Sequence, residues 1–140
     1  MRPGTAEEAR RLEAALLEEL RAELPQATNG SLTLVEELEG RVVAGLTGRT
    51  SYGWLHVDVL WVARAARRQG HGRRLMQAAL GEARAMRCHG VWLDTSNPAA
   101  RAFYLALGFE DFGCLANGDG QHPETHRRWF LRRSAGMRDD

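Results

Sequence analysis

Hydrophobic residues near the N-terminus recur at a helical spacing, with Glu and Arg between them: Ala9, Leu12, Leu16 and Leu20. One face of an α-helix repeats every 3.6 residues, so this spacing predicts an amphipathic helix. The preceding Thr5-Ala6-Glu7-Glu8 predicts a capping box, in which the side chains of Thr5 and Glu8 each accept from the other's backbone N–H. Pro25 and the pair Asn29-Gly30 predict where the helix ends. We expect its apolar face to cover a sheet.

The next part of the chain has the spacing of strands. Ser31–Glu37 alternates apolar and polar residues, which places three side chains on one side, namely Leu32, Leu34 and Glu36. Glu39-Gly40 is a turn signal before the apolar run Val42–Leu46, so the two segments predict a hairpin. Trp54–Val62 is the strongest predicted strand, because it is rich in aromatic and β-branched residues.

After Gly72 the helical spacing returns, in Leu75, Met76, Ala79, Leu80, Ala83 and Met86. Gly90 closes this helix, and residues 91–93 form a short apolar strand. Asn97 or Ser96 can cap the next helix, which we expect to direct Phe103 and Leu107 inward before it ends at Gly108.

Residues 109–115 and 126–132 are the last predicted strands. The order of elements is therefore helix, two or three strands, helix, strand, helix and two strands. This order predicts a mixed α/β (α+β) fold, with helices on the faces of a mixed sheet, rather than a regular βαβ repeat. At 140 residues, we expect one domain over residues 1–140.

Composition narrows the class of protein. The chain is 44% hydrophobic and 26% charged, with a net charge of +1, so no global field favours nucleic-acid binding. Two cysteines form no disulfide framework. Neither a signal peptide nor a long apolar run is visible, so we expect no membrane association and a cytoplasmic location.

A glycine loop lies between the strongest strand and the following helix, with the sequence Arg67-Arg68-Gln69-Gly70-His71-Gly72. Backbone N–H groups at a helix start bind anions, and neighbouring arginines can add charge-assisted bonds, so the loop suits a pyrophosphate. The Lys-Ser/Thr pair of a Walker loop is absent, and Leu75 replaces the third glycine of a dinucleotide motif. From these residues alone, a purely structural turn remains an equal alternative.

Two blocks in this chain resemble the GCN5-related N-acetyltransferase (GNAT) superfamily. The first is an apolar strand, four residues, R-x-x-G-x-G and a helix, here Val59–Val62 and Arg67–Gly72. The second is a short strand, an Asn and a helix ending A-x-x-F-Y-x-x-x-G-F, here with Asn97 and Phe103-Tyr104. They follow in the family's order over about half the chain. The resemblance implies a central, mostly antiparallel sheet whose middle strands splay apart, with helices on both faces.

The resemblance also implies acetyl-CoA as the co-substrate and no metal. Main-chain groups of Leu60, Trp61 and Val62 would contact the pantetheine arm, as would Asn97, although Asn97 can equally be a simple helix cap. The loop would hold the pyrophosphate, through Arg67, Arg68, Gln69, Gly70, His71, Gly72 and Arg73. Tyr104 would lie beside the thioester sulfur, and the alternative for Tyr104 is a helix tyrosine that packs its ring into the core.

An acyl transfer to an amine needs a base for the amine and a proton donor for the leaving thiolate. By the resemblance, Tyr104 is the predicted acid to the CoA thiolate. His56 aligns with a position where some relatives carry a catalytic Glu, and Asp58 lies on the same face of its strand. The base is therefore left open between His56, Asp58 and a chain of waters, and His56 with Asp58 can also simply fix the strand.

We expect the acceptor to be a primary amine of a small molecule. Two alternatives remain open, a protein or peptide N-acetyltransferase and a non-catalytic acyl-CoA-binding regulatory module. A homodimer is also left open, since dimers are common among similar proteins.

The loose spacing of Cys114, His122 and His126 favours a solvated loop over a zinc site. The aromatic residues Trp54, Trp61 and Trp92 are expected in the core or in a pocket wall.

Overall fold

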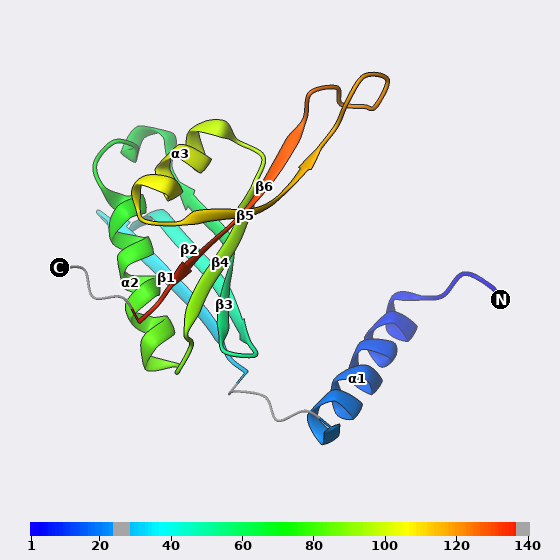
Figure 1. The fold of residues 1–140 in the computed structure, drawn as a ribbon. Coiled ribbons are helices and arrows are strands. Elements are labelled where there is room, and N and C mark those ends of the chain that lie inside the picture. The colour runs from blue at the N-terminus through cyan, green and yellow to red at the C-terminus, as the bar shows by residue number, and fades with distance from the viewer. Residues whose placement is uncertain (24–28, 137–140) are drawn as a thin grey trace.

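A computed structural model describes residues 1–23 and 29–136, in which helices and strands follow the predicted order (Figure 1). The helices are α1 (Ala6–Glu23), α2 (His71–Ala85) and α3 (Pro98–Ala106), with a short 3₁₀ turn at Arg64–Ala66. The strands are β1 (Ser31–Leu38), β2 (Arg41–Ser51), β3 (Trp54–Val62), β4 (Gly90–Thr95), β5 (Glu110–Ala116) and β6 (Arg127–Ser134).

The six strands form one sheet in the order β1-β2-β3-β4-β6-β5. Tight turns at Glu39-Gly40 and Tyr52-Gly53 join β1 to β2 and β2 to β3, and all four turn residues have positive φ. Only β3 and β4 are paired in parallel, because α2 carries the chain back across the sheet between them. The predicted mixed, mostly antiparallel sheet is confirmed.

The two parallel strands pair over only three residues each. Trp54, Leu55 and His56 of β3 pair with residues 90–92 of β4, while β3 continues to Val62 beside β2 alone. The strands therefore separate beyond His56, as the resemblance implied for the middle of the sheet. This separation leaves unpaired backbone on β3 directly before the glycine loop.

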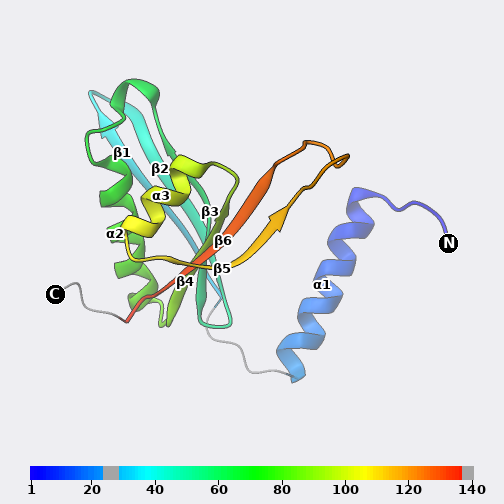
Figure 2. The ribbon, with the colours of Figure 1, turned by 45° about the horizontal axis from the view of Figure 1, so that its top comes forward.

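Helices α2 and α3 pack on the same face of the sheet, where the hydrophobic core lies (Figures 1 and 2). The core combines apolar side chains of α2, including Leu75, Met76 and Leu80, with residues of the central strands. Alternate residues of β3 and β4 contribute to this core, because successive side chains of a strand point to opposite faces of the sheet. These residues are Leu55, Val57, Val91 and Leu93.

Helix α1 does not cover the sheet as predicted. None of its residues is buried, and the side chains of Leu12 and Leu16 are 73% and 56% exposed. Figure 2 shows α1 apart from the strands. Its residue Leu17 nevertheless borders one cavity together with Trp54 and Trp92, on the face of the sheet opposite α2 and α3, which we call the helix-free face. The helical spacing correctly predicts an amphipathic helix, but spacing carries no information about what its apolar face contacts.

The capping box of α1 is confirmed: Glu8 Oε1 accepts from the backbone N–H of Thr5 at 3.0 Å, and Thr5 Oγ1 accepts from that of Glu8 at 3.1 Å. The predicted end signal at Pro25 lies outside the described residues. Within the described ranges, no helix is long and apolar enough to span a membrane.

Candidate functional site

The glycine loop turns sharply into α2. Gly70 is the N-cap residue of that helix, and its φ of 83° lies in the left-handed region that glycine adopts without steric cost. At Gly72, an added Cβ would lie 3.4 Å from Cζ of Phe103 on α3, an ordinary van der Waals distance, so packing alone does not require glycine there. The first N–H groups of α2 have no partner within the helix, which makes its start suited to an anion.

A groove of about 670 Å³ lies beside this loop. Three parts of the chain line it: the end of β3, the loop with the start of α2, and the first turns of α3. The lining includes most of the predicted cofactor residues, namely Leu60, Trp61, Val62, Arg67, Arg68, Gly70, His71, Gly72 and Arg73. Gln69, Asn97 and Tyr104 are not among the described residues that line it. One continuous groove therefore joins the splayed strand to the glycine loop.

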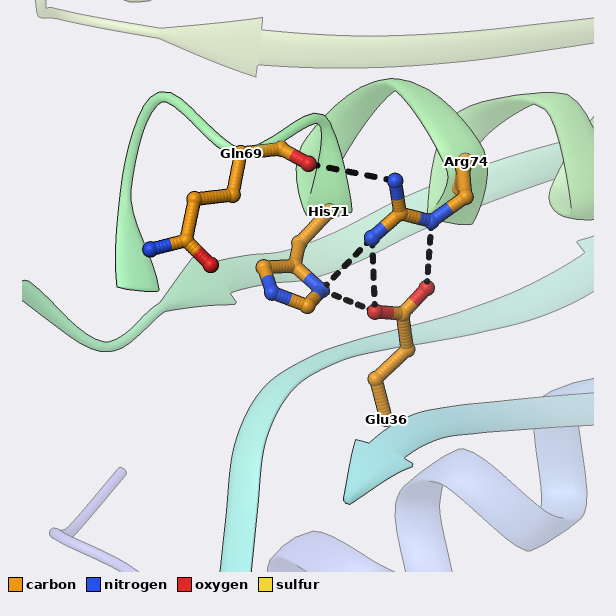
Figure 3. Close-up of polar contacts among 4 residues, drawn as sticks. All are labelled: Glu36, Gln69, His71 and Arg74. Carbon is orange, nitrogen blue, oxygen red and sulfur yellow. Dashed lines mark hydrogen bonds and ion pairs between the residues drawn. The ribbon is translucent and has the colours of Figure 1, made fainter. Parts of the chain in front are cut away.

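The side chain of His71 belongs to a polar cluster at the base of the loop (Figure 3). It is only 5% exposed, and its Nδ1 contacts Glu36 Oε2 from β1. Arg74 donates from Nε and Nη2 to the same carboxylate, at 3.2 and 3.3 Å, and from Nη1 to the backbone carbonyl of Gln69 at 3.1 Å. The hydrogen bonds from Arg74, and next those with His71, hold the pKa of Glu36 below its usual value.

Sequence reasoning missed Glu36 as a part of this site. The alternation of β1 had placed Glu36 on the same side as Leu32 and Leu34, and all three are half-buried. A carboxylate at an inward position needs a partner, so the pattern carried a signal. It did not identify His71 and Arg74, which lie 35 and 38 residues further along the chain.

Asn97 caps α3, which confirms one of its two open roles. Its Oδ1 accepts from the backbone N–H groups of Ala99 at 2.9 Å and Ala100 at 3.4 Å. Pro98 occupies the first turn, where the missing N–H costs nothing. The predicted contact of Asn97 with a cofactor stays a prediction.

Tyr104 and Phe103 exchange the environments that the sequence predicted for them. Tyr104 is 8% exposed and belongs to the core, where its ring lies 5.8 Å from that of Phe109. Phe103, which was expected to occupy the core position, is half-buried at the edge of the core and lines the groove. Burial, and then the charge of Asp94, raise the pKa of Tyr104 to about 12.

His56 and Asp58 lie together on the helix-free face, as their spacing predicted. His56 Nδ1 is 2.9 Å from Asp58 Oδ1, and its ring stacks on Trp92 with 3.9 Å between centroids. Arg49 Nε and Nη2 donate to the Asp58 carboxylate at 3.0 and 3.1 Å, and these bonds hold the pKa of Asp58 below its ordinary value. His56 Nε2 is buried and makes no hydrogen bond within the described part of the chain.

Asp94 is a second polar residue that sequence reasoning missed. It lies on β4 two residues beyond Trp92, on the same face, and its Oδ1 is 3.5 Å from His56 Nε2. Arg128 Nε lies 3.3 Å from its other oxygen. In the sequence Asp94 directly follows the predicted apolar strand at residues 91–93, and that position was the available signal. Asp94 therefore lies between His56 and Arg128, and its charge also contributes to the raised pKa of Tyr104.

An aromatic cavity of about 280 Å³ adjoins this polar group, lined by Trp54, Trp92, Phe112, Phe130 and Arg132. The prediction that Trp54, Trp61 and Trp92 lie in the core or in a pocket wall is confirmed, because Trp54 and Trp92 line this cavity and the half-exposed Trp61 lines the groove beside the glycine loop. Within residues 1–23 and 29–136, no three His, Cys, Asp or Glu side chains come together in a way that would hold a metal ion.

The sequence matches the family described as Acetyltransferase (GNAT) family over residues 5–109. Acetyltransferase Atu2258 of Agrobacterium fabrum is 42% identical over 77 residues, which are 55% of this chain and 56% of that protein. Blasticidin-S acetyltransferase of Streptomyces morookaense is 39% identical over 71 residues, 50% of this chain and 52% of that protein. The matches thus span about half the length of these curated relatives.

The fold is similar to the crystal structure of an acetyltransferase from Bacillus cereus ATCC 14579. The TM-score is 0.84 at 25% identity, over 96% of both chains. The similarity therefore includes nearly the whole fold, beyond the two blocks that the sequence resemblance used.

Proposed function

Because the chain belongs to the acetyltransferase (GNAT) family, we propose that it transfers an acetyl group from acetyl-CoA to a primary amine of a small molecule. One observation carries this proposal: a single groove joins the unpaired part of β3 to an arginine-rich loop at a helix start. Acetyl-CoA has the matching shape, since a thin pantetheine arm connects its reactive thioester to a pyrophosphate.

The residues of the groove fit both parts of this co-substrate. Gly70 and Gly72 keep side chains away from the N–H groups at the start of α2, and Arg67, Arg68 and Arg73 line the groove as cations for a pyrophosphate. Leu60–Val62 lie beyond the residues of β3 that pair with β4, so this edge of the strand is where the amides of pantetheine would pair. The carbonyl of Val62 already accepts from Arg67 Nε at 3.1 Å. Arg74 is already bonded to Glu36, so we do not assign it to the phosphates.

His56 is the better of the two candidates for the base. Asp58 is bound by Arg49 and its pKa is lowered, so its carboxylate is a poor proton acceptor near neutral pH. The same carboxylate can orient His56 by accepting from Nδ1–H, which leaves Nε2 as the proton acceptor. A buried nitrogen without a hydrogen bond supports this assignment. A chain of waters is the alternative path for the proton.

Tyr104 is the proposed donor to the leaving thiolate. With a pKa of about 12, its hydroxyl keeps its proton throughout the neutral range, as a donor must. Phe103, the neighbouring residue on α3, lines the groove, which supports a place for Tyr104 close to the bound thioester. Tyr104 thus acts on the CoA sulfur from the helix-covered face, while His56 receives the amine proton on the opposite face.

The helix-free face suits a small amine. The aromatic cavity of about 280 Å³ offers ring faces, which attract cations, although Arg132 already lies over the ring of Phe112. Trp92 also stacks on His56, and Asp94 adds a carboxylate 3.5 Å from His56 Nε2. A protonated amine can bind there before it loses its proton to His56. The relative named blasticidin-S acetyltransferase, whose name gives a small molecule as its acceptor, supports the same class of acceptor.

Release of free CoA thiol from acetyl-CoA, measured with a panel of primary amines, tests this function. We expect Tyr104→Phe to lower kcat by about 10²–10⁴-fold, the usual loss when acid–base help is removed. Tyr52→Phe is the matched control, because Tyr52 lies in the exposed β2–β3 turn, and it should leave kcat unchanged. CoA binding without transfer to any amine would contradict the enzyme assignment, and transfer only to peptides would contradict the acceptor class.

A further inference from the structure

The proposed pyrophosphate loop has a backbone shape that needs outside support. Arg68 and Gly70 both have positive φ, at 65° and 83°. Glycine adopts this conformation readily, but a residue with a Cβ adopts it only at an energetic cost. Such conformations persist where surrounding groups determine them. The shape of the loop therefore depends on contacts made beyond the loop itself.

The supporting contacts converge on one carboxylate (Figure 3). Glu36 accepts two hydrogen bonds from Arg74, whose third bond goes to the main-chain oxygen of Gln69 inside the loop. His71 lies between them, with Nδ1 against Glu36 and 3.0 Å from Arg74 Nη2. The carboxylate thus contacts the first residue of α2 and, through Arg74, the residue before Gly70.

We propose that Glu36 is a positioning residue for the co-substrate: from edge strand β1 it holds His71 and Arg74, and through them holds the loop in its pyrophosphate-binding shape. The inference rests on the proposed function, since it assumes that the loop binds a pyrophosphate. The negative charge of Glu36 supports a positioning role rather than direct contact with the pyrophosphate. A carboxylate near an anion site opposes anion binding by its charge, so its place there is explained by the groups that it orients.

Burial makes these contacts hard to replace. His71 is 5% exposed, and its Nε2 already has no hydrogen bond within the described residues. Loss of Glu36 would remove the acidic partner of this buried ring and release the guanidinium of Arg74 from β1. Buried polar groups without partners favour rearrangement, so the loop would sample other conformations.

Calorimetric titration with CoA measures how the loss of Glu36 changes the affinity of the protein for CoA. We expect Glu36→Ala to raise the Kd for CoA about tenfold, the order expected when a hydrogen bond to a charged group is lost. Glu36→Gln keeps the length and one acceptor oxygen, so we expect part of the affinity to return. Glu37→Ala is the charge-matched control, since Glu37 is the exposed neighbour on β1 and its loss should not weaken CoA binding. Unchanged or tighter binding by Glu36→Ala would overturn the proposal.

A truncated thioester separates positioning of the loop from a general effect on the fold. S-acetylpantetheine lacks the pyrophosphate, so Glu36→Ala should leave its kcat/KM unchanged while kcat/KM for acetyl-CoA falls. An equal fall for both thioesters would show that Glu36 supports the whole site rather than this loop, and the proposal would be wrong.

Hydrogen exchange without ligand tests the same contacts independently of activity. The amides of residues 69–73 should exchange faster in Glu36→Ala and Glu36→Gln than in the wild type, but not in Glu37→Ala. If wild-type protein binds no CoA, the proposed function fails, and the exchange rates still report on the loop. Unchanged exchange in both Glu36 variants would refute the positioning role.

Discussion

His56 and His71 have the same local chemistry in different surroundings. Each has Nδ1 against a carboxylate and a buried Nε2 without a hydrogen bond in the described part of the chain. His56 lies where β3 and β4 separate and borders a cavity of about 570 Å³, so its ring is next to the space proposed for the amine. His71 is buried under the loop beside Glu36 and Arg74, so we assign it to holding the loop. Position decides between the two roles.

The raised pKa of Tyr104 predicts a specific loss of stability at high pH. The unfolded chain releases this proton near the ordinary value of 10, and the folded protein releases it near 12. Between these values the native state binds more protons, so the free energy of unfolding falls as pH rises. The sequence has two tyrosines and no lysine, so few other side chains titrate there.

Urea unfolding of wild type and Tyr104→Phe between pH 9 and about pH 12 measures this difference. The wild type should lose more stability than the variant over that range. Parallel pH profiles for the two proteins would contradict the burial of the Tyr104 hydroxyl.

Among the elements, α3 depends most clearly on a single residue. Its nine residues are too few for a stable isolated helix, so its cap and its packing hold it in place. Asn97 supplies the cap, and Tyr104 and Leu107 supply the buried face. The same element borders the groove through Phe103, so its placement sets one wall of the proposed cofactor site.

Asn97→Ala should lower the free energy of unfolding by about 1 kcal/mol, the usual value for loss of an N-cap side chain. Asn97→Asp keeps an acceptor oxygen and adds a favourable charge at the helix start, so its stability should be close to that of wild type. Urea denaturation compares the three proteins. A stable Asn97→Ala with weakened CoA binding would instead point to the cofactor contact as the main role of Asn97.

At the scale of the whole molecule, stability and apolar surface are unevenly distributed. One face of the sheet carries α2, α3 and the core, whereas the other carries the aromatic cavity and the polar group around His56. Helix α1 contributes no buried residue to either face. The fold of the sheet therefore rests on α2 and α3, and α1 adds little to it.

Two leucine truncations test this distribution. Leu131→Ala removes a fully buried side chain of β6 and should cost about 2–5 kcal/mol of unfolding free energy. Leu12→Ala removes an exposed side chain of α1 and should change it by less than about 0.5 kcal/mol. Chemical denaturation of the two variants gives the comparison. A cost above 1 kcal/mol for Leu12→Ala would show that α1 packs on something in solution.

Much of the proposed cofactor site was predictable, because its signals are local. The glycines of the loop, the apolar strand before it and the Asn97 cap each depend on residues only a few positions apart. The proposed acceptor side was less predictable: Asp94 and the aromatic cavity form where β4, β5 and β6 meet β3, and no short segment contains them.

The sequence by itself determined the order of helices and strands, the turn at Gly70 and the start of α2 directly after it, since backbone preferences and capping act between near neighbours. The tertiary structure decided which faces meet. It brought Glu36 to His71 and Arg74, turned Tyr104 rather than Phe103 into the core, and left the apolar face of α1 uncovered. These outcomes depend on how elements pack, and the spacing of residues within one element does not contain that information.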